Sequence, residues 1–228
     1  MSVMNLTSTL NRIPIVLCFD ANYANFAAVA TYSAHKNSKS TLVFYWIFTP
    51  ECEEHSKKLK ELLQKFGIQI NLLVLDVSSL NDWKTGYHFT TATYSRLFAP
   101  DLLASEAKAL YLDCDTLVLT DVLNLYNTPL NDARLAGVID EGGGKTSKVP
   151  RAADDTYINT GVVLMDLQAL REDGFSERCK ILYERFKNEI TWADQCVINK
   201  YAEGRKIILD PKWNRQIFSQ YINARDFY

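Results

Sequence analysis

Two aspartates separated by one residue, Asp113 and Asp115, follow an apolar run and are the side chains of this sequence best suited to metal chemistry. Because strand side chains alternate faces, both carboxylates are predicted to point the same way. Such a pair suits Mg²⁺ or Mn²⁺, which prefer oxygen ligands and leave coordination sites open for a substrate phosphate. An Asp-x-Asp in a solvated turn also arises by chance, so the pair alone does not decide the function.

Five further polar residues stand at the ends of predicted elements, where ligands are often bound. Asp20 and Asn22 follow the first apolar run, Asp140 follows a later one, and Asp194 and Gln195 precede a helical pattern. In an open α/β sheet, ligands bind beyond the carboxyl ends of the strands. Each position also has a structural explanation, since Asp and Asn are good helix N-caps and Asp140 could simply end a strand in solvent.

Apolar, strand-like runs alternate with longer amphipathic stretches, which predicts an α/β fold with a mostly parallel central sheet flanked by helices. The predicted strands are 13–19, 42–48, 68–77, 107–112, 136–139, 162–165 and 207–209. The predicted helices are 22–35 (with Phe26 and three alanines at helical spacing), 50–66, 91–103, 175–186 and 193–201. The glycine-containing stretch 140–155 is predicted to be a loop. Because no repeat or linker divides the chain, residues 1–228 are predicted to form one domain.

Composition excludes several classes of protein. The formal net charge of -2 gives no basic field for nucleic acid, and the five scattered cysteines indicate reduced thiols, not a disulfide framework. No segment reaches the ~20 apolar residues that a membrane span needs. We therefore expect a cytoplasmic protein without an integral membrane segment or a nucleic-acid partner.

Five short motifs, in order along the chain, resemble glycosyltransferase family 8. They are Asp20-Ala21-Asn22-Tyr23, Thr93-Tyr94-Ser95-Arg96-Leu97, Tyr111-Leu112-Asp113-Cys114-Asp115, Tyr157-Ile158-Asn159-Thr160-Gly161-Val162 and Asp194-Gln195. That family includes bacterial lipooligosaccharide galactosyl- and glucosyltransferases and glycogenin. The resemblance implies a GT-A (Rossmann-like) fold and sugar transfer with retention.

The resemblance also implies roles for individual residues. Asp113 and Asp115 would bind the metal, Mn²⁺ or Mg²⁺, and Gln195, Asp194 and Arg96 would be catalytic. Arg96 would neutralise donor charge, although an arginine on a helix face is more commonly solvated. The nucleotide-sugar would contact Asp20, Asn22, Tyr23, Phe89, Arg96, Asp113, Cys114, Asp140, Asn159, Asp194 and Gln195.

The function implied is transfer of a hexose, galactose or glucose, from a UDP-sugar to a glycan or lipid-linked saccharide, as in lipopolysaccharide biosynthesis. Because Gln195 is a poor nucleophile, we expect front-face transfer without a covalent intermediate. Such a cytoplasmic enzyme could also lie peripherally at the inner face of the membrane.

One family segment, His-x-x-Gly-x-x-Lys-Pro-Trp, has no counterpart here, so we expect the domain to be truncated at its C-terminal end. The alternative function is a catalytically weak or inactive nucleotide-sugar-binding module. A nucleotidyltransferase is disfavoured, because Asp20-Ala21-Asn22-Tyr23 stands where that class carries a glycine-rich basic loop.

Overall fold

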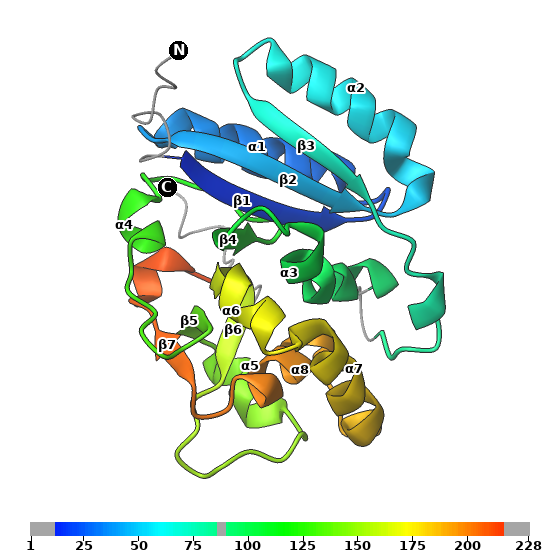
Figure 1. The fold of residues 1–228 in the computed structure, drawn as a ribbon, viewed down its shortest axis with the longest axis vertical. Coiled ribbons are helices and arrows are strands. Elements are labelled where there is room, and N and C mark those ends of the chain that lie inside the picture. Colours follow the sequence, from blue (N-terminus) through cyan, green and yellow to red (C-terminus); the bar gives the residue numbers. More distant parts are fainter. Residues whose placement is uncertain (1–11, 86–89, 217–228) are drawn as a thin grey trace, which may run out of the picture.

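The computed structural model describes residues 12–85 and 90–216 and contains a central sheet of seven strands. The strands lie in the order β3-β2-β1-β4-β6-β5-β7 (Figure 1). Their bounds are Arg12–Phe19 (β1), Thr41–Phe48 (β2), Gln69–Val74 (β3), Lys108–Leu112 (β4), Leu135–Ile139 (β5), Ile158–Asp166 (β6) and Lys206–Ile208 (β7).

The sheet is mostly parallel, as predicted. β1 pairs in parallel with β2 and β4, β2 with β3, and β5 with β7, whereas β6 runs antiparallel to both β4 and β5. β6 begins four residues before the predicted 162–165, because the polar residues Asn159 and Thr160 belong to the strand. β1 is buried along almost its whole length, as its continuous apolar sequence requires in a sheet covered on both faces.

Helices cover both faces of the sheet. They are α1 (Ala24–Asn37), α2 (Glu53–Gln64), α3 (Ala99–Leu102), α4 (Leu123–Tyr126), α5 (Glu141–Thr146), α6 (Leu167–Glu172), α7 (Phe175–Phe186) and α8 (Ala193–Tyr201). Short 3₁₀ helices span Pro50–Cys52, Ser78–Leu80, Thr91–Phe98 and Pro211–Trp213.

The strand β1 divides the interior into two cores. Ile15 and Leu17 pack in the core covered by α1 and α2, and Val16 packs in the core that also holds Tyr94 and Phe175. This alternation follows from the two-residue period of a strand. Figure 1 shows α1 and α2 beside strands β1–β3, with α7 and α8 near the other end of the molecule.

Two predictions about local structure were wrong. The stretch 91–103 is a 3₁₀ helix followed by α3, because Pro100 lacks an N–H and cannot continue a single helix through this point. The stretch 140–155 is not all loop, since it contains α5. Phe26 lies at helical spacing with the buried alanines of α1, yet its side chain is 54% exposed.

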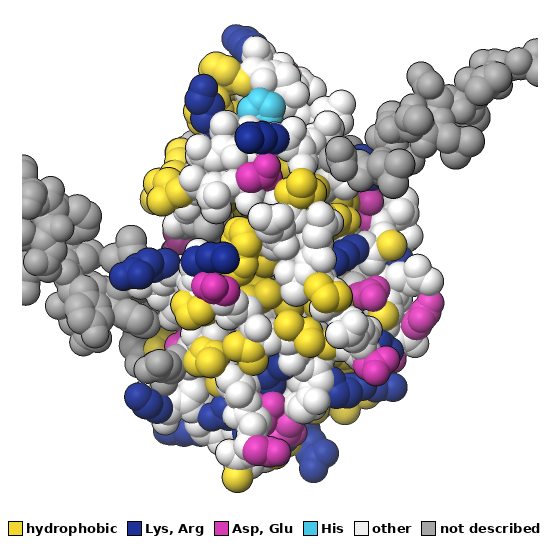
Figure 2. All heavy atoms as spheres, turned by 90° about the vertical axis from the view of Figure 1, so that its left-hand side faces the viewer, with side chains coloured by type: hydrophobic (Ala, Val, Ile, Leu, Met, Phe, Trp, Pro, Cys, Tyr) yellow, Lys and Arg dark blue, Asp and Glu magenta, His cyan; other side chains and the backbone are white. Residues whose placement is uncertain are grey.

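One face of the molecule carries charged side chains of both signs. Figure 2 shows a face on which Lys and Arg side chains are interspersed with Asp and Glu, without a broad field of one sign. Within residues 12–85 and 90–216, no helix has the length and apolar character needed to cross a bilayer.

Candidate active site

Two adjoining cavities lie where β1 and β4 end. The first, of about 100 Å³, is lined by Asp20, Tyr23 and Asp115, among others. The second, of about 300 Å³, has Asp140 in its wall together with Asn159, Asp194 and Gln195. Thr93, Arg96 and Asp113 line both cavities, so the two cavities meet at these side chains.

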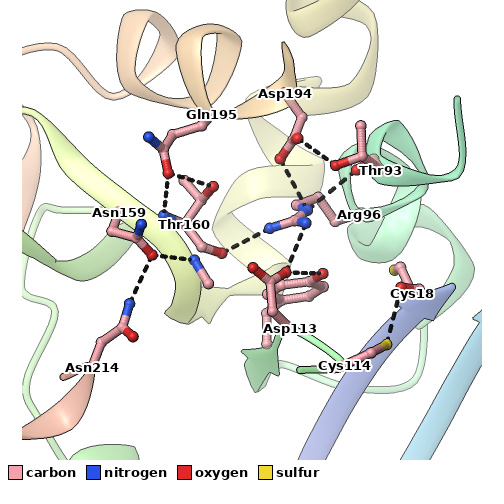
Figure 3. A network of polar contacts seen from close by, with 12 residues as sticks. Cys18, Thr93, Arg96, Asp113, Cys114, Asn159, Thr160, Asp194, Gln195 and Asn214 are labelled. Atoms are coloured by element: carbon pink, nitrogen blue, oxygen red, sulfur yellow. Dashed lines mark hydrogen bonds and ion pairs between the residues drawn. The ribbon is translucent and has the colours of Figure 1, made fainter. Parts of the chain in front are cut away.

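Arg96 is the centre of a polar network between the cavities (Figure 3). Its Nη2 donates to Asp113 Oδ1 at 2.8 Å, its Nε lies 2.9 Å from Asp194 Oδ2, and its Nη1 donates to the carbonyl of Thr160 at 2.8 Å. The guanidinium also lies over the Tyr111 ring, 4.2 Å from its centroid. Arg96 is only 8% exposed, so the alternative of a solvated arginine on a helix face is wrong.

The charges of this network stabilise one another. Burial opposes the positive charge of Arg96, but the carboxylates of Asp113 and Asp194 outweigh it and raise the pKa of the guanidinium. Burial raises the pKa of Asp194, while Arg96 and the Thr93 hydroxyl oppose that rise. Two carboxylates therefore stand at the junction of the cavities around one permanent cation.

Asp113 and Asp115 lie in the turn after β4, because the strand ends at Leu112. The prediction that strand alternation aligns them was therefore wrong, although both carboxylates do line the first cavity. Asp113 Oδ1 accepts hydrogen bonds from Arg96 and from the Tyr111 hydroxyl, the latter at 2.8 Å. Burial in the cavity, and then the charge of Asp113, raise the pKa of Asp115.

The carboxylate oxygens of Asp113 and Asp115 that are available at this turn fit a hard cation. Within the described ranges, no hydrogen bond reaches Asp113 Oδ2, and no cluster of three or more His, Cys, Asp or Glu side chains could hold a metal by itself. Mg²⁺ is commonly bound by one or two carboxylates together with substrate phosphates. Asp113 and Asp115 match that mode of binding.

Asp140 links the polar residues of the second cavity. Its Oδ2 accepts from Gln195 Nε2 at 3.0 Å and from Asn159 Nδ2 at 3.2 Å, and its Oδ1 accepts from the Gly143 N–H at 2.7 Å. The last bond caps α5. Gln195 Oε1 in turn accepts from the Thr160 N–H at 3.0 Å. The orientation of the Gln195 amide is thus fixed at both of its polar atoms.

Gly161 allows two site residues to approach the backbone of β6. A Cβ at this position would lie 2.9 Å from Asp113 Oδ2 and 2.9 Å from Asn159 Oδ1. Asn159 Oδ1 accepts from the Gly161 N–H and from Asn214 Nδ2, both at 2.8 Å. Thr160 and Asn214 were not among the predicted site residues. Thr160 lies inside one of the five motifs, between Asn159 and Gly161, and that position was the available signal for it.

The helix-capping alternatives are also wrong. Asp20 Oδ1 accepts from the Asn22 N–H at 2.9 Å and Oδ2 from the Thr90 hydroxyl at 2.7 Å, while the N-cap position of α1 is Tyr23. Asp194 and Gln195 likewise lie inside the first turn of α8, whose N-cap position is occupied by Trp192.

The three remaining predicted residues, Cys114, Asn22 and Phe89, have different outcomes. Cys114 lines the first cavity, and its Sγ donates to the Cys18 carbonyl at 3.3 Å. Asn22 is exposed and lines neither cavity. Phe89 lies outside the described residues.

Comparison with known proteins identifies the family. The family model "Glycosyl transferase family 8" matches residues 14–227. General stress protein A of Bacillus subtilis is 28% identical over 214 residues, which are 90% of this chain and 74% of that protein. The lipopolysaccharide 1,2-glucosyltransferase of Escherichia coli K12 is 28% identical over 201 residues, 86% of this chain but only 60% of that protein. The chain also spans only 55% of a rat glycosyltransferase 8 domain-containing protein.

Solved structures agree. The galactosyltransferase LgtC in complex with donor and acceptor sugar analogs superposes with a TM-score of 0.80 at 25% identity, covering 88% of this chain and 74% of that one. The glycosyltransferase GlyE of Streptococcus pneumoniae, at 21% identity and a TM-score of 0.69, shares the fold, covering 95% of this chain and 50% of that one. The GT-A architecture and the family match over nearly the whole described chain show that this protein belongs to glycosyltransferase family 8.

Proposed function

We propose that this chain transfers a hexose from a UDP-sugar, with retention of anomeric configuration, to a saccharide or lipid-linked saccharide acceptor. The observation that carries the proposal is the junction of the two cavities at Arg96 and Asp113. A donor spanning this junction would place its diphosphate between nucleoside and sugar, beside the two aspartates of the turn.

The two cavities differ in their chemistry. The first offers the aromatic ring of Tyr23 and the carboxylate of Asp20, which suit stacking and hydrogen bonding of a nucleoside. The second offers the amides of Asn159 and Gln195 and the carboxylate of Asp194, which suit hydrogen bonds to sugar hydroxyls. We therefore assign the nucleoside to the first cavity and the sugar to the second.

The cofactor in this proposal is Mn²⁺ or Mg²⁺ held by Asp113 and Asp115. When bound, it supplies a Lewis acid that stabilises the negative charge developing on the departing diphosphate. Arg96 keeps the Asp113 carboxylate oriented toward this turn, because Arg96 Nη2 and the Tyr111 hydroxyl both hold Asp113 Oδ1. The permanent charge of Arg96 also offsets part of the negative charge of Asp113 and Asp194 at the junction.

The fixed amide of Gln195 supports front-face transfer. Its oxygen accepts from the Thr160 N–H at 3.0 Å and from the Thr160 hydroxyl at 3.4 Å, so both lone pairs are engaged and attack on the anomeric carbon would displace one of these bonds. In the proposed reaction, the bond from C1 to the diphosphate oxygen breaks and a bond from C1 to the acceptor oxygen forms. The hydroxyl proton of the acceptor passes to the departing phosphate oxygen. Gln195 then positions the sugar and forms no covalent bond to it.

Two sugars are the first candidates. The Escherichia coli relative is named as a glucosyltransferase and LgtC as a galactosyltransferase. Incubation with UDP-glucose or UDP-galactose, Mn²⁺ and a panel of free and lipid-linked oligosaccharides, followed by NMR of the product, tests the proposal. We expect UDP release that depends on both metal and acceptor, an α-linked product, and loss of turnover in Asp115→Asn. A β-linked product would exclude retention, and donor binding without turnover of either sugar would favour the inactive binding module.

A further inference from the structure

The outer surface of α1 and α2 carries large hydrophobic side chains that no described part of the chain covers. Phe26, Val29 and Tyr32 lie along α1 at spacings of three residues, and Leu62 and Phe66 lie in the last turn of α2 and just beyond it. These five side chains are between 38% and 58% exposed. Residues three apart on a helix lie on the same side, so these residues form one surface, called here the outer α1–α2 face.

Contacts between the two helices make this face continuous. The rings of Tyr32 and Phe66 meet edge to face, with centroids 5.2 Å apart. At the other end of the helices, His55 Nε2 lies 2.9 Å from Asn25 Oδ1. Both helices therefore run side by side from the carboxyl edge of the sheet, and their apolar residues form one band.

The band begins at the mouth of the first cavity. The ring of Tyr23, which lines that cavity, contacts the ring of Phe26 at a centroid distance of 5.7 Å. A partner lying on the outer α1–α2 face would consequently lie next to the opening of this cavity.

The two helices carry more lysines than glutamates. Residues 24–37 and 53–66 together contain five lysines and three glutamates, although the whole chain has a net charge of -2. Glu53 and Glu54 are each paired with a lysine one turn later, at 2.7 Å. Within the described chain, the ion pairs include none for Lys36, Lys60 or Lys65. The same ion pairs include none for the exposed Glu61, so these unpaired groups together leave an excess of positive charge for a partner.

We propose that the outer α1–α2 face docks this protein on the surface of an anionic lipid bilayer. Aromatic and aliphatic side chains enter the boundary between headgroups and acyl chains, while neighbouring lysines attract anionic headgroups. A second copy of the chain fits this face less well, because a two-fold interface would bring the lysines of both copies together. Contiguous exposed apolar side chains of this kind mark interaction surfaces, whereas singly scattered ones do not.

Docking in this orientation places the opening of the first cavity, to which the nucleoside is assigned, beside the membrane, and the second cavity, to which the sugar is assigned, beyond the junction at Arg96 and Asp113. This consequence rests on the proposed function, but docking itself does not. Binding can be measured with no nucleotide or acceptor present, so failure of one proposal is distinguishable from failure of the other.

The test is co-sedimentation of the purified full chain with vesicles of phosphatidylcholine, with and without phosphatidylglycerol. One variant, Phe26→Ser with Val29→Ser and Phe66→Ser, removes the apolar band, and a second, Lys36→Glu with Lys60→Glu and Lys65→Glu, reverses its charge. The matched control is Ile181→Ser with Lys187→Glu on or next to α7, where Ile181 is 59% exposed. In Figure 1, α7 lies far from α2.

We expect the wild type and the α7 control to sediment with phosphatidylglycerol vesicles, and each face variant to bind at least about tenfold more weakly. The charge-reversal variant replaces no buried side chain. If the serine variant folds poorly, vesicle binding by the charge-reversal variant still tests the proposal. Equal binding of all variants, or no binding of the wild type to either vesicle, would overturn the proposal. The proposal would also be overturned if the wild type were a dimer, the face variants were monomers, and neither form bound vesicles.

Discussion

Arg96 Nη2 donates to Asp113 Oδ1 across 2.8 Å, and this pair joins the 3₁₀ helix Thr91–Phe98 to the turn that follows β4. The same guanidinium contacts Asp194 at the start of α8 through its Nε. Three segments that are distant in the sequence therefore depend on one buried cation. Because removing one partner of a buried ion pair leaves the other charge uncompensated, this residue controls both stability and site geometry.

Replacement of Arg96 by Gln should destabilise the protein strongly. We expect a loss of about 3–5 kcal/mol in the free energy of unfolding, because Asp194 would remain buried without its cation. Arg96→Lys should recover only part of the loss, since an ammonium group cannot reproduce the planar set of donors. Urea denaturation of both variants measures this. A loss below about 1 kcal/mol in Arg96→Gln would show that the network contributes little to stability.

Replacement of Gly161 by Ala should impair the metal site more than the fold. The new methyl group would lie 2.9 Å from Asp113 Oδ2, the oxygen that remains available to a cation. We expect metal-dependent binding of UDP to weaken by at least about tenfold, equivalent to about 1.4 kcal/mol, while the melting temperature falls by only a few degrees. Calorimetry with Mn²⁺ and thermal denaturation separate the two effects. Unchanged binding would show that Asp113 can move without cost.

Ala193 has a left-handed backbone conformation, with φ of 41°, immediately before Asp194 and Gln195. For a residue with a Cβ, this conformation costs roughly 1–2 kcal/mol, which glycine avoids. Ala193→Gly should therefore leave stability unchanged or raise it by about 1 kcal/mol, whereas Ala193→Val should lower it. Ala34→Gly in the buried interior of α1 is the matched control and should cost about 1 kcal/mol. Equal losses at both positions would contradict this account.

Gln195→Glu should make activity depend on pH in a new way. The new carboxylate would face Asp140 Oδ2, to which Gln195 Nε2 now donates at 3.0 Å. Two carboxylates in one site raise the pKa of one of them, so a shared proton restores the hydrogen bond only as the pH falls. We expect kcat of the variant to rise toward acid pH relative to that of the wild type. Parallel pH profiles would argue against a close contact between these side chains.

Glu106 should contribute to acid sensitivity. Burial opposes its ionisation, but hydrogen bonds from Arg12 and Tyr45 outweigh burial, and the pKa of Glu106 is lowered. A carboxylate with a lowered folded-state pKa stabilises the protein above its unfolded pKa of about 4.3, and this stabilisation is lost as the pH falls through the folded value. The free energy of unfolding should therefore decrease less for Glu106→Gln than for wild type on acidification. Urea titrations at about pH 7 and about pH 3 measure the difference.

Hydrophobic pattern predicted most of the fold. The helices at 175–186 and 193–201 and the core strands have the expected places, because runs of apolar residues report burial directly. The beginning of β6 was missed because Asn159 and Thr160 are polar residues that line the second cavity. The 3₁₀ helix at Thr91–Phe98 was missed because its form depends on Pro100 and on the tertiary contacts of Arg96.

The site was predictable as a set of motifs but not as a network. Resemblance selected Asp140 and Gln195, yet their hydrogen bond joins residues 55 positions apart and depends on side-chain orientation. Asn214 was missed for the same reason, since its role is visible only in its contact with Asn159. A sequence gives the positions of such residues, whereas packing decides which atoms meet.

The central claim is that the first cavity binds a nucleotide through a cation at Asp113 and Asp115. Calorimetric titration of UDP, with and without Mn²⁺, on wild type and Asp115→Asn tests it most directly. Asp115 is suited to the test because Asp113 also pairs with Arg96. We predict binding that requires Mn²⁺ in the wild type and is weakened at least about tenfold in the variant. Equal binding of UDP in all four titrations would contradict the claim, because neither the cation nor Asp115 would then contribute to recognition of the nucleotide.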